Sequence, residues 1–207
     1  MTENTNSKFP SEADVVIVGV GGIVGSMIAY WLSELGQKNI VGLEKSSVIP
    51  SDIASTAHAS DFVYNTTHDK LGCWTTAYSR KFYEDNGFFL KKGGLEICRK
   101  GDDARWEELK RKVGSGKAFG TNVRLISAAE AKEKFPLLDE ESLMGAMWDP
   151  DAGLVIPRSQ DVVSFAVESA KDKGALKTFT DTPALDFEVE NGRVTGVKTD
   201  KGFIKAD

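Results

Sequence analysis

Cysteine is scarce in this sequence, and its placement excludes a disulfide framework. The two cysteines, Cys73 and Cys98, lie far apart, and neither has a second cysteine at the spacing of a metal-ligand pair. Two thiols without such partners are typical of a protein kept in a reducing compartment. We therefore expect no metal centre and interpret both residues as buried thiols.

Long apolar runs and an excess of basic residues are also missing. No run approaches the length that spans a membrane, and the first residues lack the apolar core of a signal peptide. The 26 basic residues are outnumbered by 31 acidic ones, so the net charge of −5 leaves no surplus to neutralise nucleic-acid phosphates. We expect a cytoplasmic protein that binds neither membrane nor nucleic acid, with residues 1–12 as a mobile tail.

The sequence does contain a strand, a glycine-rich turn and a helix in direct succession near its start. The apolar run Val15–Val18 is typical of a parallel strand buried on both faces, and it opens on the glycine-rich segment 19–25. A second short strand over 40–44 ends in the carboxylate Glu44, which completes a βαβ unit. The helix between the strands is expected to bury four residues at helical spacing. They are Val24, Ile28, Trp31 and Leu35.

This βαβ unit has the features of a dinucleotide site. Glycines in the turn let the backbone approach a pyrophosphate, whose charge is stabilised by the helix N-terminus. Glu44 stands where a carboxylate accepts hydrogen bonds from a ribose diol, an arrangement that serves FAD and NAD alike. The glycine spacing is irregular because Gly25 comes one position late. Two registers stay open: a longer turn from Gly21 to Gly25, or Val20 at the first glycine position.

The segment 45–61 has no periodicity and is expected to be a loop. It contains several serines and the run Ser55-Thr56-Ala57-His58-Ala59. A lone histidine in such a loop usually does no more than hydrogen-bond locally. Here, however, the loop follows the carboxylate expected at the ribose. We therefore expect the loop to run past the cofactor toward its ring end.

Taken in order, these segments resemble the N-terminal half of a known flavoprotein group. The group comprises dimethylglycine oxidase, dimethylglycine dehydrogenase and sarcosine dehydrogenase, among the flavoproteins similar to D-amino-acid oxidase. The resemblance covers nearly all of the chain after Glu12 and rests on the order and spacing of several short motifs. The matching motifs are Val15-Val16-Ile17-Val18-Gly19 with the glycine turn, Leu43-Glu44-Lys45, Ser55-Thr56-Ala57-His58-Ala59, Gly93-Gly94-Leu95-Glu96, Phe135-Pro136-Leu137-Leu138, Asp149-Pro150-Asp151-Ala152-Gly153 and Gly192-Arg193-Val194-Thr195-Gly196-Val197.

The resemblance implies FAD as the cofactor, covalently attached to the protein. His58 stands where this group bonds a histidine ring nitrogen to the 8α-methyl of the flavin. Glu44 would bind the adenosine ribose, and Ala184 would offer its backbone to the adenine. Ser55 and Thr56 would lie near the pyrophosphate or the flavin ring. The expected cofactor-binding residues are Gly19, Gly21, Gly22, Gly25, Glu44, Lys45, Ser55, Thr56, His58, Ala59 and Ala184.

The expected fold class is α/β, a Rossmann-like FAD-binding domain similar to D-amino-acid oxidase with an inserted α+β substrate domain. After one βαβ unit the chain does not continue with a second, as a nicotinamide domain would. It returns with a helix, a strand and a β-meander whose hairpin turn is Asn191-Gly192. We expect the FAD-binding domain over 13–87 and 149–207, C-terminally incomplete, and the insertion over 88–148.

The implied reaction is the oxidative demethylation of a small N-methylated amino acid such as dimethylglycine or sarcosine. A hydride leaves the carbon next to nitrogen for the flavin; no catalytic residue is assigned. One alternative is a nicotinamide-dependent dehydrogenase domain, against which the loop of His58 argues. Another is a non-catalytic fragment, or a subunit that completes a flavin site with another chain. We expect this chain alone to be inactive without a missing C-terminal portion or a complementary chain.

Two further features are interpreted as structural. Asp149 and Asp151 flank a proline and are expected to lie in turns. The helix expected over 68–86 carries an apolar side, and the four tryptophans fall on expected apolar faces, so the tryptophans are placed in the core. The helix side consists of Leu71, Trp74, Tyr78 and Phe82, and the tryptophans are Trp31, Trp74, Trp106 and Trp148.

Overall fold

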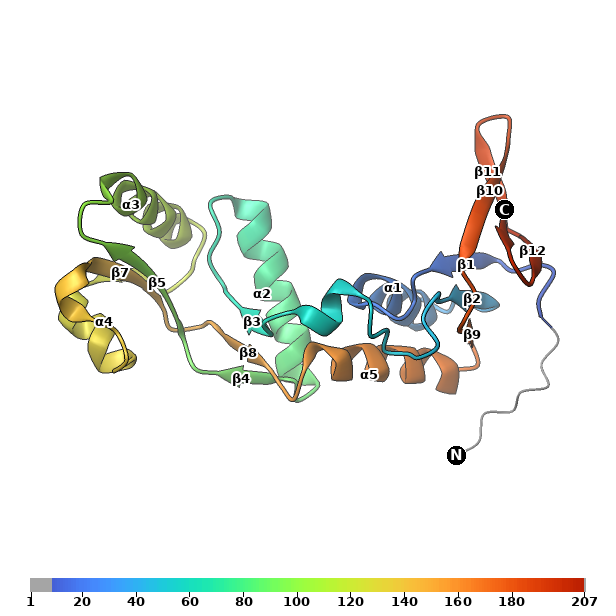
Figure 1. Cartoon of the computed structure of the whole chain (residues 1–207), viewed down its shortest axis with the longest axis horizontal. Coiled ribbons are helices and arrows are strands. Elements are labelled where there is room, and N and C mark those ends of the chain that lie inside the picture. The colour runs from blue at the N-terminus through green and yellow to red at the C-terminus, as the bar shows by residue number, and fades with distance from the viewer. Residues whose placement is uncertain (1–8, 207) are drawn as a thin grey trace. The chain divides into compact units, whose positions relative to one another are not determined.

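The computed structural model describes residues 9–206 and divides them into two compact units (Figure 1). The first unit contains the described residues up to Ala59 and from Arg158 onward, and the second contains Ser60–Pro157. The second unit begins earlier and ends later than the insertion expected over 88–148. The chain therefore crosses between units directly after the loop that carries His58.

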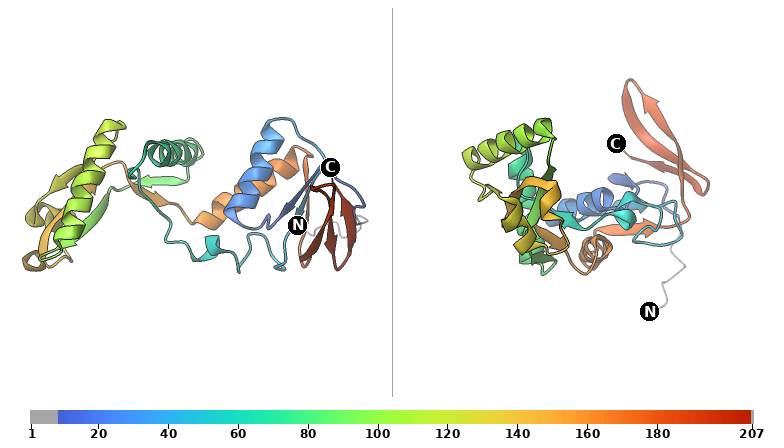
Figure 2. Two further views of the ribbon diagram at one scale, coloured as in Figure 1. Left: turned by 90° about the horizontal axis from the view of Figure 1, so that it is seen from above. Right: turned by 60° about the vertical axis from the view of Figure 1, so that its left-hand side comes forward.

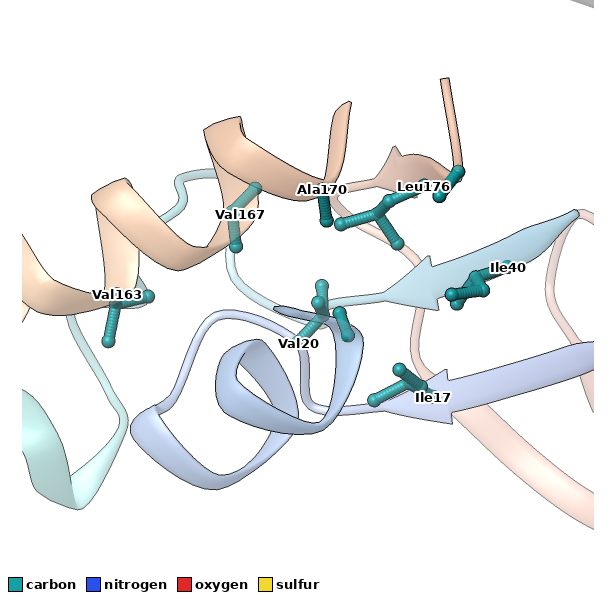
Figure 3. Close-up of a cluster of buried hydrophobic side chains, with 9 residues drawn as sticks. Ile17, Val20, Ile40, Val163, Val167, Ala170 and Leu176 are labelled. Atoms are coloured by element: carbon teal, nitrogen blue, oxygen red, sulfur yellow. The ribbon is translucent and has the colours of Figure 1, made fainter. Parts of the chain in front are cut away.

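The first unit is built on a parallel sheet of three strands in the order β1-β2-β9. Helices α1 and α5 cover one face of this sheet. Figure 3 shows Val167 and Ala170 of α5 on the side of the helix that faces Ile40 and Leu176 of the strands. The buried cluster also contains Ile17 and Val20, so the first strand and the glycine-rich turn of the expected βαβ unit both contribute to the core. The elements are β1 (Val15–Val18), α1 (Ile23–Glu34), β2 (Ile40–Leu43), the 3₁₀ turn η1 (Ser55–His58), α5 (Ser159–Asp172) and β9 (Leu176–Phe179).

An antiparallel meander follows the parallel sheet, and Figure 2 shows its three strands side by side. Asn191 and Gly192 both have positive φ, 51° and 80°, as a two-residue hairpin turn requires. This confirms the predicted hairpin. Val197 and Ile204 of the meander pack in a cluster that includes strand β2. The strands are β10 (Ala184–Glu190), β11 (Arg193–Thr199) and β12 (Gly202–Lys205).

The expected mobile tail over 1–12 is only partly within the described residues. Residues 1–8 lie outside them. Two contacts attach the described part of this segment to the first unit: the ring of Phe9 meets that of Phe179 edge to face at 5.2 Å, and the Ser11 carbonyl accepts a backbone hydrogen bond from Lys205. Ser11 and Glu12 themselves are exposed.

The buried face of α1 differs from the apolar stripe expected from the sequence. Val24 is 71% exposed and Leu35 is 82% exposed, and Ile28 and Trp31 are exposed as well. The helix instead buries small residues, which allow its backbone to lie close to the sheet and to α5. The predicted face was therefore wrong, since close packing selected small side chains over large apolar ones. The buried residues are Gly25, Ser26, Ala29 and Ser33.

The second unit contains two small sheets and three helices among residues 60–157. The sheet β5-β7-β6 packs with α3 around Leu109, Val113 and Met147. Asp102 caps α3, and Ser127 with Glu130 forms the predicted capping box of α4. The elements are β3 (Phe62–Val63), α2 (Lys70–Asp85), β4 (Phe89–Lys91), β5 (Gly94–Arg99), α3 (Asp103–Ala118), β6 (Arg124–Ile126), α4 (Ala128–Lys134), η2 (Glu140–Ser142), β7 (Leu143–Asp149) and β8 (Gly153–Val155).

Hydrogen bonds explain why residues 60–87 belong to the second unit. Phe62 in β3 pairs with Leu154 in β8, which places the start of this segment in a sheet of the second unit. The buried carboxylate of Asp149 accepts hydrogen bonds from the Asn65 backbone and from the Thr66 hydroxyl, at 3.1 and 2.9 Å. These pairings join positions more than eighty residues apart, and no local sequence pattern marks them.

The tryptophans divide into packed and exposed residues. Trp106 and Trp148 pack against buried clusters of the second unit, as expected. Trp74 is 60% exposed and stacks on Tyr78, which is also exposed, with ring centroids 5.5 Å apart. The interpretation of Trp31 and Trp74 as core residues was therefore wrong, and Leu71 and Tyr78 of the apolar stripe expected on α2 are exposed as well. Of that stripe, only Phe82 is buried.

Candidate nucleotide-binding site

A cavity of about 460 Å³ opens in the first unit at the carboxyl ends of β1 and β2. In parallel α/β sheets, ligands bind at this end of the strands. Six of the residues expected to bind the cofactor line the cavity, together with Ser51, Ile53 and Thr182 among others. The six are Gly19, Gly22, Glu44, Lys45, Ser55 and Ala184.

The glycines of the turn after β1 differ in backbone conformation and in the space available for a side chain. Gly19 has a φ of +85°, which favours glycine. A Cβ on Gly25 would lie 2.3 Å from the carbonyl oxygen of Gly19, so Gly25 allows the helix to pack against the turn. A Cβ on Gly21 would lie 2.6 Å from the carboxylate of Glu44. At Gly22 the nearest atom would be 3.6 Å away, so a methyl group fits there.

The Glu44 carboxylate is fixed at the cavity wall by three donors. Its side chain is only 4% exposed. Oε2 accepts a hydrogen bond from the Gly21 backbone at 3.0 Å, and Oε1 accepts from the Ser46 backbone at 3.0 Å and from the Ser51 hydroxyl at 3.2 Å. Backbone and hydroxyl donors thus stabilise a buried negative charge. Ser46 and Ser51 were not identified from the sequence, because the loop that contains them has no periodicity.

Thr56 caps the first helix rather than pointing into the cavity. Its side chain is buried, and Oγ1 accepts a hydrogen bond from the backbone N–H of Ile23 at 3.0 Å. Gly22, the residue at the N-cap position of α1, has no side chain to do this. The loop that carries His58 is thereby attached to the start of α1.

His58 ends the short 3₁₀ turn η1, and its side chain is exposed to solvent. It does not line the cavity, whereas Ser55 at the start of the same turn does. Ala59 follows the turn and donates a backbone hydrogen bond to Thr56 at 3.3 Å. An exposed imidazole next to the cavity-lining segment is accessible to a ligand that extends beyond the cavity.

The opposite wall of the cavity is formed by the turn between β9 and β10. Thr182 is fully buried, and its backbone N–H donates to the carbonyl of Glu44 at 2.9 Å. The ammonium group of Lys201 donates to the carbonyl of Thr180 and to the hydroxyl of Thr182, both at 2.8 Å. These bonds position Ala184, which follows Pro183 in the lining. Nothing in the sequence pattern identified Lys201 as a support for this wall.

The acidic pair Asp149 and Asp151 has a structural role in the second unit. Asp149 is buried at the end of β7, and Asp151 lies in the turn that follows. Burial raises the pKa of Asp151, but hydrogen bonds from Lys91 and Asn122 outweigh burial and hold this pKa below its ordinary value. The interpretation of this segment as a structural turn is consistent with these contacts.

Two kinds of site were not found within residues 9–206. No group of three or more histidine, cysteine, aspartate or glutamate side chains is placed to hold a metal ion in this part of the chain. Nor does any helix of the described residues have the length and apolar character needed to cross a membrane.

Comparison with known proteins gives consistent matches over most of the chain. The chain is 32% identical to the mitochondrial pyruvate dehydrogenase phosphatase regulatory subunit of Mus musculus, over 95% of this chain and 22% of that protein. It is 27% identical to human mitochondrial sarcosine dehydrogenase, over 99% of this chain and 23% of that protein. The solved structure of L-proline dehydrogenase from P. horikoshii superposes with a TM-score of 0.83 at 30% identity, over 96% of this chain and 52% of that structure.

The comparisons also give the share of each relative that the chain covers and the family to which the chain belongs. It spans less than a quarter of the length of both curated relatives and about half of the solved structure. A family model described as FAD dependent oxidoreductase, or DAO, matches residues 14–207. This match, together with the superposition on L-proline dehydrogenase, bears out the expected fold class and excludes the nicotinamide alternative. The chain belongs to the DAO family of FAD-dependent oxidoreductases.

Proposed function

We propose that this chain forms the FAD-binding part of an enzyme that oxidises a small N-methylated amino acid, such as dimethylglycine or sarcosine. The observation that carries the proposal is the cavity at the carboxyl ends of β1 and β2, with a buried carboxylate fixed beside the glycine turn. The relation to sarcosine dehydrogenase and the motifs described from the sequence support the substrate class.

The residues around the cavity fit the adenosine and pyrophosphate parts of FAD. A cavity of about 460 Å³ is within the usual size of cofactor sites. Gly22 leaves space beside the N-terminus of α1, where a pyrophosphate would be stabilised by the helix dipole. Glu44 would accept a ribose hydroxyl, and the backbone of Ala184 would contact the adenine. His58 would form the covalent bond to the flavin.

In this arrangement the chain binds and orients the cofactor, while other residues contact the amine. Bound FAD supplies a two-electron acceptor for the carbon–hydrogen bond next to the substrate nitrogen. The residues around Glu44 and Ala184 would hold the adenosine end, and the η1 turn would lead the chain from the cavity toward the flavin ring. Their role is therefore positioning, and no residue of this chain is assigned to proton transfer.

Additional polypeptide is expected to complete the site, either from the same protein or from a complementary chain. Strand β1 lies at one end of the sheet order β1-β2-β9, so one of its edges has no neighbouring strand among the described residues. Helix α1 exposes the apolar stripe of Val24, Ile28, Trp31 and Leu35. Proteins usually cover unpaired strand edges and exposed apolar helix faces.

The proposal is tested by the absorption spectrum of the complete, purified protein. A flavin band should be present, and anaerobic addition of dimethylglycine or sarcosine should bleach it within the time of mixing or shortly after. A related non-methylated amino acid, glycine, serves as the control and should leave the band unchanged. Absence of flavin, or a flavin that neither methylated amine reduces, would contradict the proposal.

A second candidate is a non-catalytic subunit that retains the fold. It is favoured by the 32% identity to a protein named as a regulatory subunit of a phosphatase. Such a subunit would bind flavin weakly or would hold a flavin that no amine reduces. The same spectroscopic experiment separates the two, because only the oxidoreductase gives amine-dependent bleaching.

A further inference from the structure

Ser51 is a buried polar residue inside a loop that is otherwise largely exposed. Its side chain is 1% exposed. Its backbone N–H donates to the carbonyl of Gly21 at 2.9 Å, and its hydroxyl donates to Oε1 of Glu44 at 3.2 Å. One residue therefore contacts both the glycine turn and the carboxylate beside it.

The position of Ser51 matters because the Glu44 carboxylate is buried and charged. A buried carboxylate needs hydrogen-bond donors, and its orientation follows from where those donors lie. Two of the three donors that contact it are backbone groups of Gly21 and Ser46, which any substitution leaves in place. The Ser51 hydroxyl is the side-chain donor of the three, so it is the one that a mutation can remove.

We propose that the Ser51 hydroxyl is a positioning group that holds the Glu44 carboxylate in the orientation that recognises a nucleotide ribose. A carboxylate has about four acceptor positions, and three are occupied here, two on Oε1 and one on Oε2. The remaining position is on Oε2, which is left to accept a ribose hydroxyl. Removing the Ser51 bond would free Oε1 and let the carboxylate turn away from the ligand. This inference rests on the proposed function, because it requires a nucleotide in the cavity.

The test compares nucleotides that differ only in the ribose. ADP, 2′-deoxy-ADP and 3′-deoxy-ADP are titrated by calorimetry into flavin-free complete protein carrying His58→Ala, so that no covalent flavin occupies the site. The same titrations are made with Ser51→Ala, with Ser51→Cys, and with the control Ser47→Ala in the same background. Ser47 is exposed in the same loop. Thermal unfolding of each variant is recorded alongside.

In the background protein, removing the recognised ribose hydroxyl should weaken binding about tenfold, as expected for a hydrogen bond to a charged group. We compare the dissociation constant of the deoxy nucleotide that lacks the recognised hydroxyl with that of ADP. Ser51→Ala should bring the ratio of these two constants close to one, because ADP should bind about tenfold more weakly while the affinity for the deoxy nucleotide changes little. Ser51→Cys, which retains a weaker donor of similar shape, should recover part of the ratio, and Ser47→Ala should keep all of it.

The outcomes separate the positioning role from a general structural one. If Ser51→Ala weakens ADP and both deoxy nucleotides equally, or leaves the ratio unchanged, Ser51 does not position the carboxylate. If Ser51→Ala does not fold, Ser51→Cys is used in its place. A ratio of dissociation constants in Ser51→Cys equal to that of the background protein would overturn the proposal. If the background protein itself binds ADP without discriminating the ribose, the ribose site is wrong and the role of Ser51 is lost with it.

Discussion

At the scale of single residues, the glycines after β1 differ in how much space surrounds them. The backbone of Gly19 blocks a side chain at Gly25, whereas Gly22 has room for a methyl group on the cavity side. The irregular spacing left open which glycine a phosphate would approach. The available space favours Gly22, because Gly21 is already closed off by Glu44 and Ser51.

Alanine substitutions at Gly25 and Gly22 should therefore affect different properties, stability for Gly25 and nucleotide binding for Gly22. Gly25→Ala forces α1 away from the turn, and overpacking of this kind costs about 1–3 kcal/mol, so the midpoint of thermal unfolding should fall. Gly22→Ala should leave the midpoint nearly unchanged but weaken nucleotide binding, since its methyl group occupies space beside α1. Equal midpoints for the two variants would contradict this interpretation.

Removal of the Glu44 carboxylate should weaken cofactor capture. The charge-assisted hydrogen bond to the ribose is worth roughly 1.5–3 kcal/mol, so Glu44→Ala should lower FAD affinity about tenfold or more. The measurement is made in a His58→Ala background, where no covalent bond can mask the loss. Unchanged affinity in this double variant would mean that the ribose lies elsewhere.

His58 should carry the flavin covalently in the complete enzyme, since its imidazole is exposed at the end of the η1 turn. Acid precipitation should leave the yellow colour in the protein pellet, and His58→Ala should release it to the supernatant. Asp52→Asn, an exposed change in the same loop, serves as a control that should keep the colour in the pellet. Colour in the supernatant of the unmutated enzyme would reject the covalent bond.

At the scale of elements, the turn of His58 and the first helix depend on each other through Thr56. Because Thr56 accepts the N–H of Ile23, the loop supplies the cap that Gly22 cannot. The loop is then fixed at the end nearest the cavity, and His58 follows two positions later.

Thr56→Val should therefore affect stability and flavin attachment together. Losing a helix cap costs about 0.5–2 kcal/mol, which urea unfolding would detect. A displaced loop should also slow the covalent incorporation of flavin during reconstitution with FAD. Ser55→Ala removes a neighbouring hydroxyl with no capping bond and should leave the stability unchanged. Wild-type stability and wild-type incorporation in Thr56→Val would show that the cap is not needed.

The elements also show what the sequence could and could not predict. The βαβ unit, the Asn191-Gly192 hairpin and the Ser127 capping box were predictable because each depends on residues close together in the chain. The exposed face of α1 was not, since the burial of Ala29 depends on α5, a helix more than a hundred residues away. The hydrogen bond from the Ser51 hydroxyl to Glu44 could not be predicted either, because hydrogen bonds between side chains leave no periodic pattern in the sequence.

At the scale of the whole molecule, the first unit contains the proposed cofactor site together with an open strand edge and an exposed apolar helix face. The edge of β1 and the apolar stripe of α1 lie on the same unit as the cavity. The curated relatives are more than four times as long as the aligned region. Binding of the cofactor and conversion of the substrate are thus expected to be shared between this region and other polypeptide.

Accordingly, the 207-residue chain should show no turnover by itself. The chain should also self-associate, because its open strand edge and its exposed apolar helix face can pair with the same surfaces of another copy. The assay combines the purified chain with dimethylglycine or sarcosine and an artificial electron acceptor, and size-exclusion chromatography reports its association state. A monomeric, flavin-loaded chain that oxidises either amine would overturn this expectation.

The pairing of β2 with β9 sets an order of events during synthesis. Ile40 lies opposite Leu176 in the parallel sheet, and the entire second unit is translated between these two residues. The sheet that forms the cavity therefore cannot close until the ribosome has released β9. Until then β2 has no partner on that edge, and the Glu44 carboxylate has no opposing wall. We therefore expect a cofactor to enter this cavity only after β9 has paired with β2, when the second unit has already been synthesised.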